Sequence, residues 1–200
     1  MINKLKIKNF KLKIPAKQAG FTVLESIVAI MVLSLSISGA FSAVQQSLSQ
    51  SIIAKDEIKA FYLAQEAIEI IRNKRDTNQL SIISTGSGNW LDGISALAGD
   101  SCYFGKTCRA DATGPNNIYL YSCSGSWDSC EILRQDSTTF LYNYDANDPT
   151  TNFKREIQIE SINANEVAVT VRIIWTKGLI ITREFKVKTS LFNWIRKIRE

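Results

Sequence analysis

The stretch that decides the fold reads Lys17-Gln18-Ala19-Gly20-Phe21-Thr22-Val23-Leu24-Glu25, and an apolar run follows it as far as Val44. Glu25 is the only charged residue between Lys17 and Lys55. The hydrocarbon core of a bilayer, ~30 Å thick, needs about 20 apolar residues in a helix, which satisfies every backbone polar group internally. The run therefore predicts a membrane-spanning helix.

The charge of the chain is concentrated before this helix. Residues 1–20 carry no acidic side chain and six lysines: Lys4, Lys6, Lys8, Lys11, Lys13 and Lys17. Without them the net charge of +5 becomes −1. The near-neutral body gives no electrostatic argument for nucleic-acid binding. The basic leader predicts a single-pass protein of the cytoplasmic (inner) membrane, with its leader in the cytoplasm and its C-terminus outside.

The composition argues against an enzyme. The sequence has no histidine, which excludes Ser-His-Asp and Cys-His pairs, and it contains no phosphate-binding glycine loop or nucleophile motif. We expect no cofactor. Residues 145–148 resemble the start of a calcium loop but lack its glycine and distal glutamate, so we interpret them as a turn and expect no metal. The aromatic residues of the body are interpreted as core and sheet-face residues: Tyr119, Tyr121, Phe140, Tyr142 and Tyr144.

Four cysteines lie close together in a loop-rich stretch: Cys102, Cys108, Cys123 and Cys130. Their spacing lacks the paired C-x2-C knuckles of zinc sites, and their even number after an export signal predicts two disulfides. Three pairings are possible, and the short loops 102–108 and 123–130 favour the nearest-neighbour one.

Two ordinary explanations compete for the apolar run. One is a signal peptide cleaved after Ala40, and the other is an uncleaved signal anchor. Against both, the run continues into an amphipathic pattern, a glycine precedes it at the leader junction, and Glu25 lies inside it. An unpartnered carboxylate in hydrocarbon costs several kcal/mol.

Residues 17–25 resemble the prepilin motif of type IV pilins and type II secretion pseudopilins, with Val23 where that family has leucine. The resemblance implies that a prepilin peptidase/methyltransferase cuts between Gly20 and Phe21 and N-methylates Phe21. It also implies that Glu25 serves assembly with other pilin subunits in an extracellular pilus or pseudopilus. Residues 60–72 resemble the matching segment of minor pilins and pseudopilins, which implies an accessory subunit.

An amphipathic helix follows the apolar run to about Arg75. We predict its buried stripe from apolar positions at a spacing of three or four: Ala54, Ile58, Phe61, Gln65, Ile68 and Ile71. Residues 157–187 alternate apolar and polar side chains with turns near 163–165 and 176–178, which predicts a three-stranded antiparallel meander. Short strands are expected at 118–122 and 139–144. The predicted fold is α+β, with the long helix covering the sheet.

The expected organisation has five parts: leader 1–20, transmembrane and assembly helix 21–53, amphipathic half 54–75, connection with disulfide-bearing loops 76–153, and meander with C-terminal tail 154–200. The tail, residues 191–200, is apolar and basic and is interpreted as a short amphipathic helix that packs on the sheet edge or lies on a surface. The predicted function is a pilus or pseudopilus subunit. The alternatives are a signal-anchored monomeric surface-binding protein and a secreted domain.

Overall fold

A computed structural model describes Gly20 and residues 22–113, 118–177 and 181–194. The chain forms two compact units, residues 1–51 and residues 52–200, and helix α1 (Val23–Thr85) contributes to both.

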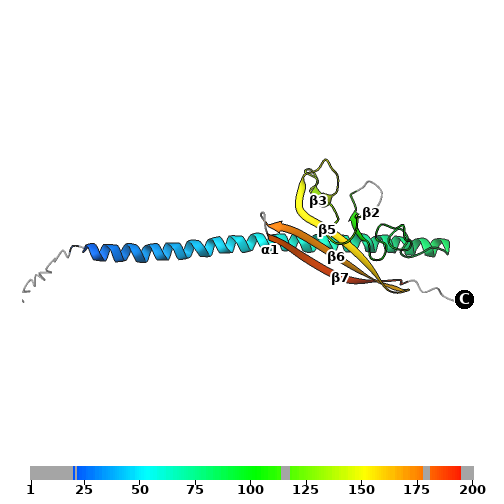
Figure 1. Cartoon of the computed structure of the whole chain (residues 1–200), viewed down its shortest axis with the longest axis horizontal. Helices are drawn as coiled ribbons and strands as arrows, with labels where there is room; N and C mark the ends of the chain where they lie inside the picture. Colours follow the sequence, from blue (N-terminus) through cyan, green and yellow to red (C-terminus); the bar gives the residue numbers. More distant parts are fainter. Residues whose placement is uncertain (1–19, 21, 114–117, 178–180, 195–200) are drawn as a thin grey trace, which may run out of the picture. The chain divides into compact units, whose positions relative to one another are not determined.

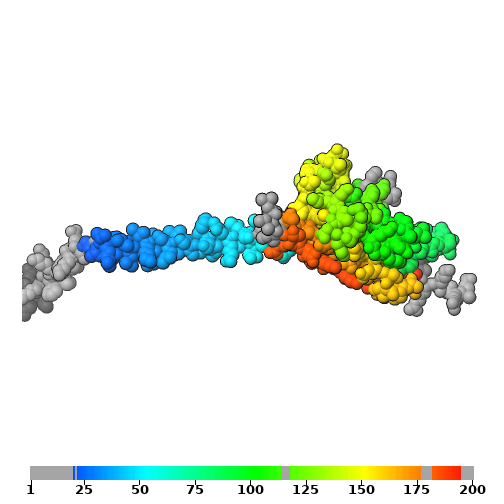
Figure 2. All heavy atoms as spheres, in the orientation of Figure 1, coloured from blue at the N-terminus to red at the C-terminus, as the bar shows by residue number. Residues whose placement is uncertain are grey.

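The part of α1 in the first unit is a bare apolar helix. Nearly all its side chains are exposed, including Leu24, Ile30 and Leu35 at 74%, 63% and 65%. Figure 2 shows the side chains that project from this stretch. Its length and composition are sufficient to cross a membrane, as the sequence predicts.

Helix α1 is longer than predicted. It ends at Thr85 rather than near Arg75, and Gly86, with φ of +74°, donates its N–H to the carbonyl of Ile82 at 2.8 Å. A left-handed glycine directly after the last turn is a common way to end a helix. The prediction of an irregular connection from residue 76 was wrong because Gln79 is fully buried and donates to Asn193, which holds the extra turns on the body.

The second unit is built on one antiparallel sheet (Figure 1). The described strands are β1 (Thr107–Asp111), β2 (Tyr119–Ser122), β3 (Ile132–Gln135), β4 (Tyr142–Asn143), β5 (Thr150–Asn163), β6 (Glu166–Lys177) and β7 (Ile181–Phe192). Strand β5 is central: β6 and then β7 pair on one side of it, while β1 and β3 share its other side, followed by β2 and β4.

The predicted meander is confirmed as β5–β6–β7. Its register places Ile157 opposite Val171, and Val171 opposite Val187. On β6 the inward residues Val169, Val171 and Ile173 are completely buried. Strand β6 is buried on both faces, since Ala168 and Thr170 between these residues are buried as well, and the alternation of residue types still marks it as a strand.

The α+β architecture is confirmed, but the predicted helix stripe was rotated. Ile58 and Phe61 are 58% and 52% exposed, and of the predicted stripe only Ile71 is completely buried. The buried apolar residues of α1 form the face that meets the sheet. These are Ala60, Leu63, Ala64, Ala67, Ile70 and Ile71. The alanines allow the helix backbone to approach the sheet closely, whereas the larger Phe61 lies at the margin, with its ring 6.1 Å from that of Phe185.

The smaller elements fit the predictions unevenly. Strand β2 matches the expected 118–122, but β4 is only two residues long, and Phe140 and Leu141 lie in the preceding loop. Strand β7 extends to Phe192, so the tail begins as a strand rather than a helix. Residues 195–200, on which the predicted tail helix depends, lie outside the described residues.

Candidate functional site: the N-terminal motif

Gly20 is exposed, and a Cβ built on it would meet no atom within 4 Å. A residue without a side chain gives a protease close access to the backbone. Phe21, the predicted site of N-methylation, lies outside the described residues. The structure therefore describes the glycine before the predicted cut and the helix after it.

Thr22 caps helix α1. Its Oγ1 accepts a hydrogen bond from the N–H of Glu25 at 3.2 Å, and its carbonyl accepts one from the N–H of Ser26 at 3.1 Å. A threonine at the N-cap satisfies an amide that has no partner within the helix. Glu25 occupies the third helical position, where the helix dipole favours a carboxylate. Its side chain is exposed.

Two serines of the apolar segment satisfy their hydroxyls within the helix. Ser34 donates to the carbonyl of Ile30 and Ser36 to that of Val32, both at 2.8 Å. Such i−4 bonds allow a hydroxyl to lie in an apolar environment without another partner. The charge of Glu25 has no such local solution, and Glu25 is the only formally charged side chain from Val23 to Ala54.

The four cysteines form two disulfides in the nearest-neighbour pairing. Cys102 bonds to Cys108 and Cys123 to Cys130, with Cα–Cα distances of 5.1 and 5.0 Å. The first pair is completely buried, whereas Cys123 is partly exposed. The N–H of Cys130 donates to Oε1 of the buried Glu156 at 3.3 Å, which attaches the second loop to β5.

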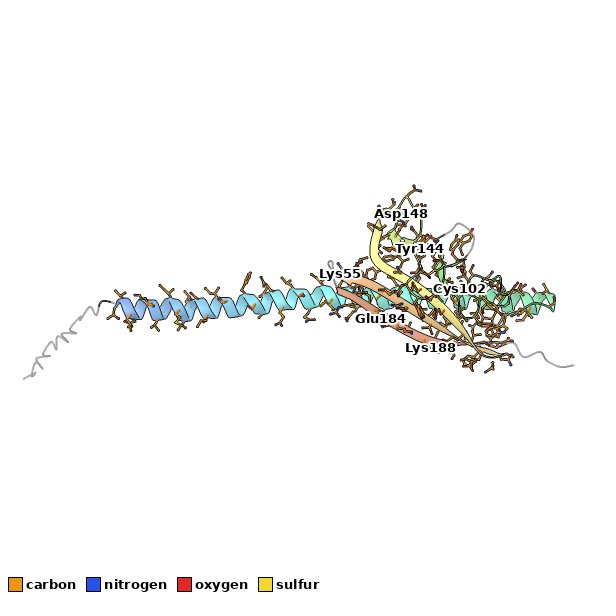
Figure 3. All side chains as sticks on the ribbon, in the orientation of Figure 1. Lys55, Cys102, Tyr144, Asp148, Glu184 and Lys188 are labelled. Atoms are coloured by element: carbon orange, nitrogen blue, oxygen red, sulfur yellow. A yellow bond between two sulfur atoms is a disulfide. The ribbon has the colours of Figure 1, made fainter. Side chains whose placement is uncertain are left out.

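The segment that resembles a calcium loop is a turn. Asp145 Oδ1 accepts from both the N–H and Nδ2 of Asn147, and the carbonyl of Asp145 accepts from the N–H of Asp148. Asp148, labelled in Figure 3, directs its carboxylate to Nδ2 of Asn143 at 2.6 Å. Among the described residues, no group of three or more His, Cys, Asp or Glu side chains could hold a metal ion.

The body also contains a buried cation that sequence reasoning missed. Arg155 on β5 donates to Oε2 of Glu66 at 2.8 Å, to the carbonyl of Ala110 at 2.7 Å and to that of Leu63 at 3.3 Å. Burial alone would lower the pKa of Arg155, but neighbouring Tyr144 and Glu66 raise the pKa above its ordinary value. Arg155 therefore remains charged and fastens α1 to the sheet.

Two local signals would have found the missed residues. Thr22-Val23-Leu24-Glu25 fits the Thr-x-x-Glu pattern of helix N-termini. Arg155 occupies an inward position two residues before Ile157, in the alternation that predicted β5.

The aromatic residues of the body fall into two groups: Tyr142 and Tyr144 pack against the core, whereas Tyr119, Tyr121 and Phe140 are exposed.

Comparison with known proteins gives one match. Residues 15–41 match the prokaryotic N-terminal methylation motif, a span that includes the leader junction, Glu25 and most of the apolar run. No curated protein and no solved structure matches the chain. The chain therefore carries the N-terminal methylation signal of the type IV pilins and pseudopilins, a family of structural rather than enzymatic proteins.

Proposed function

We propose that the chain is a structural subunit of a type IV pilus or pseudopilus, assembled through the N-terminal part of α1. A prepilin peptidase/methyltransferase cuts after Gly20 and methylates the new amine of Phe21. The observation that carries the proposal is the methylation motif over residues 15–41, joined to a helix whose apolar side chains are exposed. Such a helix needs an apolar environment, first lipid and then neighbouring helices.

The new amine gives Glu25 its role. An α-amino group has an unperturbed pKa of ~8 and is mostly cationic at neutral pH. Among packed apolar helices this cation needs an anion, and the segment from Val23 to Ala54 offers only Glu25. The pair forms within one subunit or between neighbours. Docking then removes an unpaired charge from the membrane, which favours the assembled state.

The leader and the helix support a cytoplasmic-membrane precursor with its body outside. Assembly then transfers the subunit to a pilus or pseudopilus outside that membrane, where its partners are other pilin subunits. The resemblance of residues 60–72 to minor pilins supports an accessory position rather than the bulk of the fibre. The proposed order along the chain is leader, assembly helix and β-rich body.

Mass spectrometry of the mature N-terminus tests the proposal. An N-methylated Phe21 as first residue supports the pilin pathway. A mature chain that begins at Met1 would instead indicate a signal-anchored surface protein, and one that begins at Phe41 a secreted domain. Helix α1 continues through Gly39 and Ala40 without a break, so the structure offers no extended segment there for a signal peptidase.

A further inference from the structure

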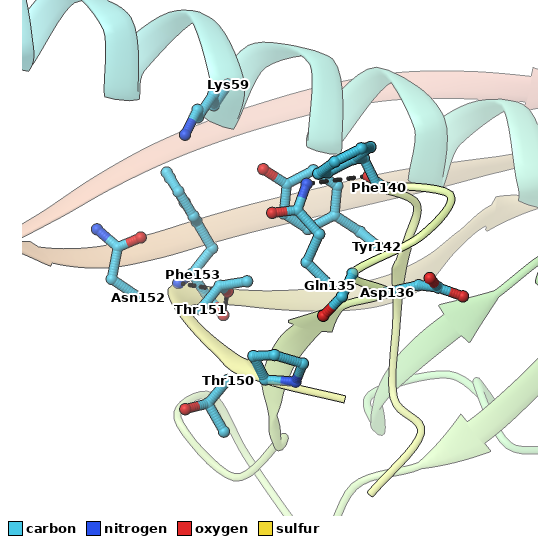
Figure 4. A pocket seen from close by; sticks show the side chains of 11 residues that line it. Lys59, Gln135, Asp136, Phe140, Tyr142, Thr150, Thr151, Asn152 and Phe153 are labelled. Atoms are coloured by element: carbon cyan, nitrogen blue, oxygen red, sulfur yellow. Dashed lines mark hydrogen bonds between the residues drawn. The ribbon is translucent and has the colours of Figure 1, made fainter. Parts of the chain in front are cut away.

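The body contains a pocket that the assembly proposal does not use. It has a volume of about 370 Å³ and lies between α1 and the loop that joins β3 to β4 (Figure 4). Lys59 of α1 points toward Phe153 on one side of the view, while Phe140 and Tyr142 lie together on the other. Ligand pockets in proteins occupy about 300–1,000 Å³, so this one suits a small ligand.

Phe140 is held at the pocket in a conformation that side chains disfavour. Its φ is +60°, a region that few residues other than glycine adopt, and its side chain is 69% exposed. Two bonds fix it: its N–H donates to the carbonyl of Asp136, and its carbonyl accepts from Nε2 of Gln135, both at 2.9 Å. A strained backbone that keeps an aromatic ring in solvent gives the fold no packing benefit and suggests a binding role.

The polar groups of the lining are mostly neutral. Amide and hydroxyl side chains come from Gln135, Ser137, Tyr142, Thr150, Thr151 and Asn152. Burial, with some contribution from Glu66 and Asp56, raises the pKa of Tyr142, so this phenol remains a hydrogen-bond donor.

The pocket has one cation and one anion. Lys59 Nζ lies 6.0 Å from the Phe153 ring centroid and makes no hydrogen bond or ion pair within the described part of the chain. Asp136 uses Oδ1 to accept from the N–H groups of Thr138 and Thr139. These bonds hold the pKa of Asp136 below its ordinary value, so it is ionised at neutral pH. The lining charges therefore cancel.

We propose that this pocket binds a neutral saccharide of one or two rings. An exposed aromatic ring offers its face to the C–H groups of a sugar, and neutral amides and hydroxyls match hydroxyl groups that both donate and accept. The cancelled charge disfavours phosphate-rich ligands, and the many polar groups disfavour a lipid chain. The inference goes beyond assembly, because none of these residues belongs to the N-terminal motif.

The test uses the full chain in a detergent without a sugar headgroup. Saturation-transfer NMR is recorded with glucose, galactose, mannose, N-acetylglucosamine, lactose and chitobiose at millimolar concentrations. The decisive variant is Phe140→Gly, since glycine adopts φ of +60° without strain and removes only the ring. The matched control is Leu141→Ala, which truncates the next exposed apolar side chain, one that does not line the pocket.

We expect at least one sugar to receive saturation, with Phe140→Gly weakening its binding about tenfold or more and Leu141→Ala leaving it unchanged. Ser137→Ala removes a hydroxyl on the same lining and should also weaken binding. Two results would overturn the proposal: no transfer to any sugar of the panel, or binding that Phe140→Gly does not alter. Competition by an unrelated short peptide for the same signals, with no sugar specificity, would also overturn it.

Discussion

Arg155 of β5 and Glu66 of α1 form an ion pair in which only one partner is buried. The guanidinium is completely buried, the Glu66 side chain is 37% exposed, and Nη1 lies 2.8 Å from Oε2. The remaining guanidinium bonds go to backbone carbonyls of α1 and β1. One side chain thus joins the helix, the central strand and a neighbouring strand.

Replacing Arg155 should destabilise the body strongly. Arg155→Met leaves the carbonyl of Ala110 without its buried donor and Glu66 without its cation, and we expect a loss of about 2–5 kcal/mol in the free energy of unfolding. Thermal or denaturant unfolding, followed by near-UV circular dichroism of the full chain in detergent, measures it. The control is Arg183→Met, which removes the exposed pair with Glu57 that also joins β7 to α1. Arg183→Met should lower the free energy of unfolding by less than about 1 kcal/mol. Equal losses in the two variants would contradict the central role of Arg155.

Tyr144 should make the body sensitive to alkali. Burial raises its pKa above the ordinary value of 10.0, and nearby Arg155 and Arg109 offset this only partly. The neutral phenol of Tyr144 therefore contributes to the free energy of unfolding. This contribution is fully present below the pKa of ~10 that tyrosine has in the unfolded chain, and it is lost as the pH rises through the folded pKa, because the unfolded chain ionises first. The pKa of Tyr142 is raised as well, so ultraviolet titration of tyrosinate should show more than one late-ionising group, and Tyr144→Phe should remove one of them. Tyr119→Phe, which alters an exposed tyrosine, is the control and should leave that late group in place.

The two disulfides should differ in their rate of reduction. Cys102 and Cys108 are completely buried, whereas Cys123 is partly exposed, so a water-soluble thiol should reduce the 123–130 bridge first. Alkylation followed by peptide mass spectrometry on the folded chain measures the order. The cysteines of each bridge are six or seven positions apart, and the loop entropy of so short a loop predicts that removing a bridge lowers the free energy of unfolding by about 2 kcal/mol. Earlier reduction of the buried bridge would contradict the burial argument.

Glu25 should affect assembly without affecting insertion. Glu25→Val removes the proposed partner of the Phe21 amine, and breaking a buried ion pair typically costs ~3–5 kcal/mol. The cap is retained, because Thr22 accepts from the backbone N–H of residue 25 rather than from its side chain. We expect normal membrane fractionation but a large loss of the subunit from sheared filaments. Ser26→Val at the next position serves as the control, and wild-type incorporation of Glu25→Val would refute the role.

The sequence predicted the elements that repeat a strong pattern. The apolar run of α1 and the alternation along β6 each involve many residues, so a single exception does not obscure the period. The face of the second half of α1 was predicted poorly because Phe61 outweighs Ala60 in hydrophobicity, while close packing against a sheet favours the smaller side chain. Tertiary contacts decide such choices, and residues adjacent in the sequence do not reveal them.

The candidate sites show the same division. Gly20 and Glu25 are candidates that the sequence alone supplies, because their motif is local and contiguous. Arg155 was missed because its partners, Leu63, Glu66 and Ala110, are 45 to 92 residues away along the chain. The pocket beside Phe140 depends on a left-handed backbone residue, which no composition or spacing signals. The disulfide pairing was favoured by loop length, although the residues alone left three pairings open.

The positions of the two disulfides have a mechanical consequence. Each bridge joins two cysteines of the segment between α1 and β5, so no disulfide joins the helix to the strands that it covers. Under tension the sheet separates from the helix by breaking non-covalent contacts alone: the side-chain packing, the bonds of Arg155, and pairs such as Arg183 with Glu57. The bridges would then shorten the stretched polypeptide by just two small loops, and single-molecule extension traces should register almost its entire contour.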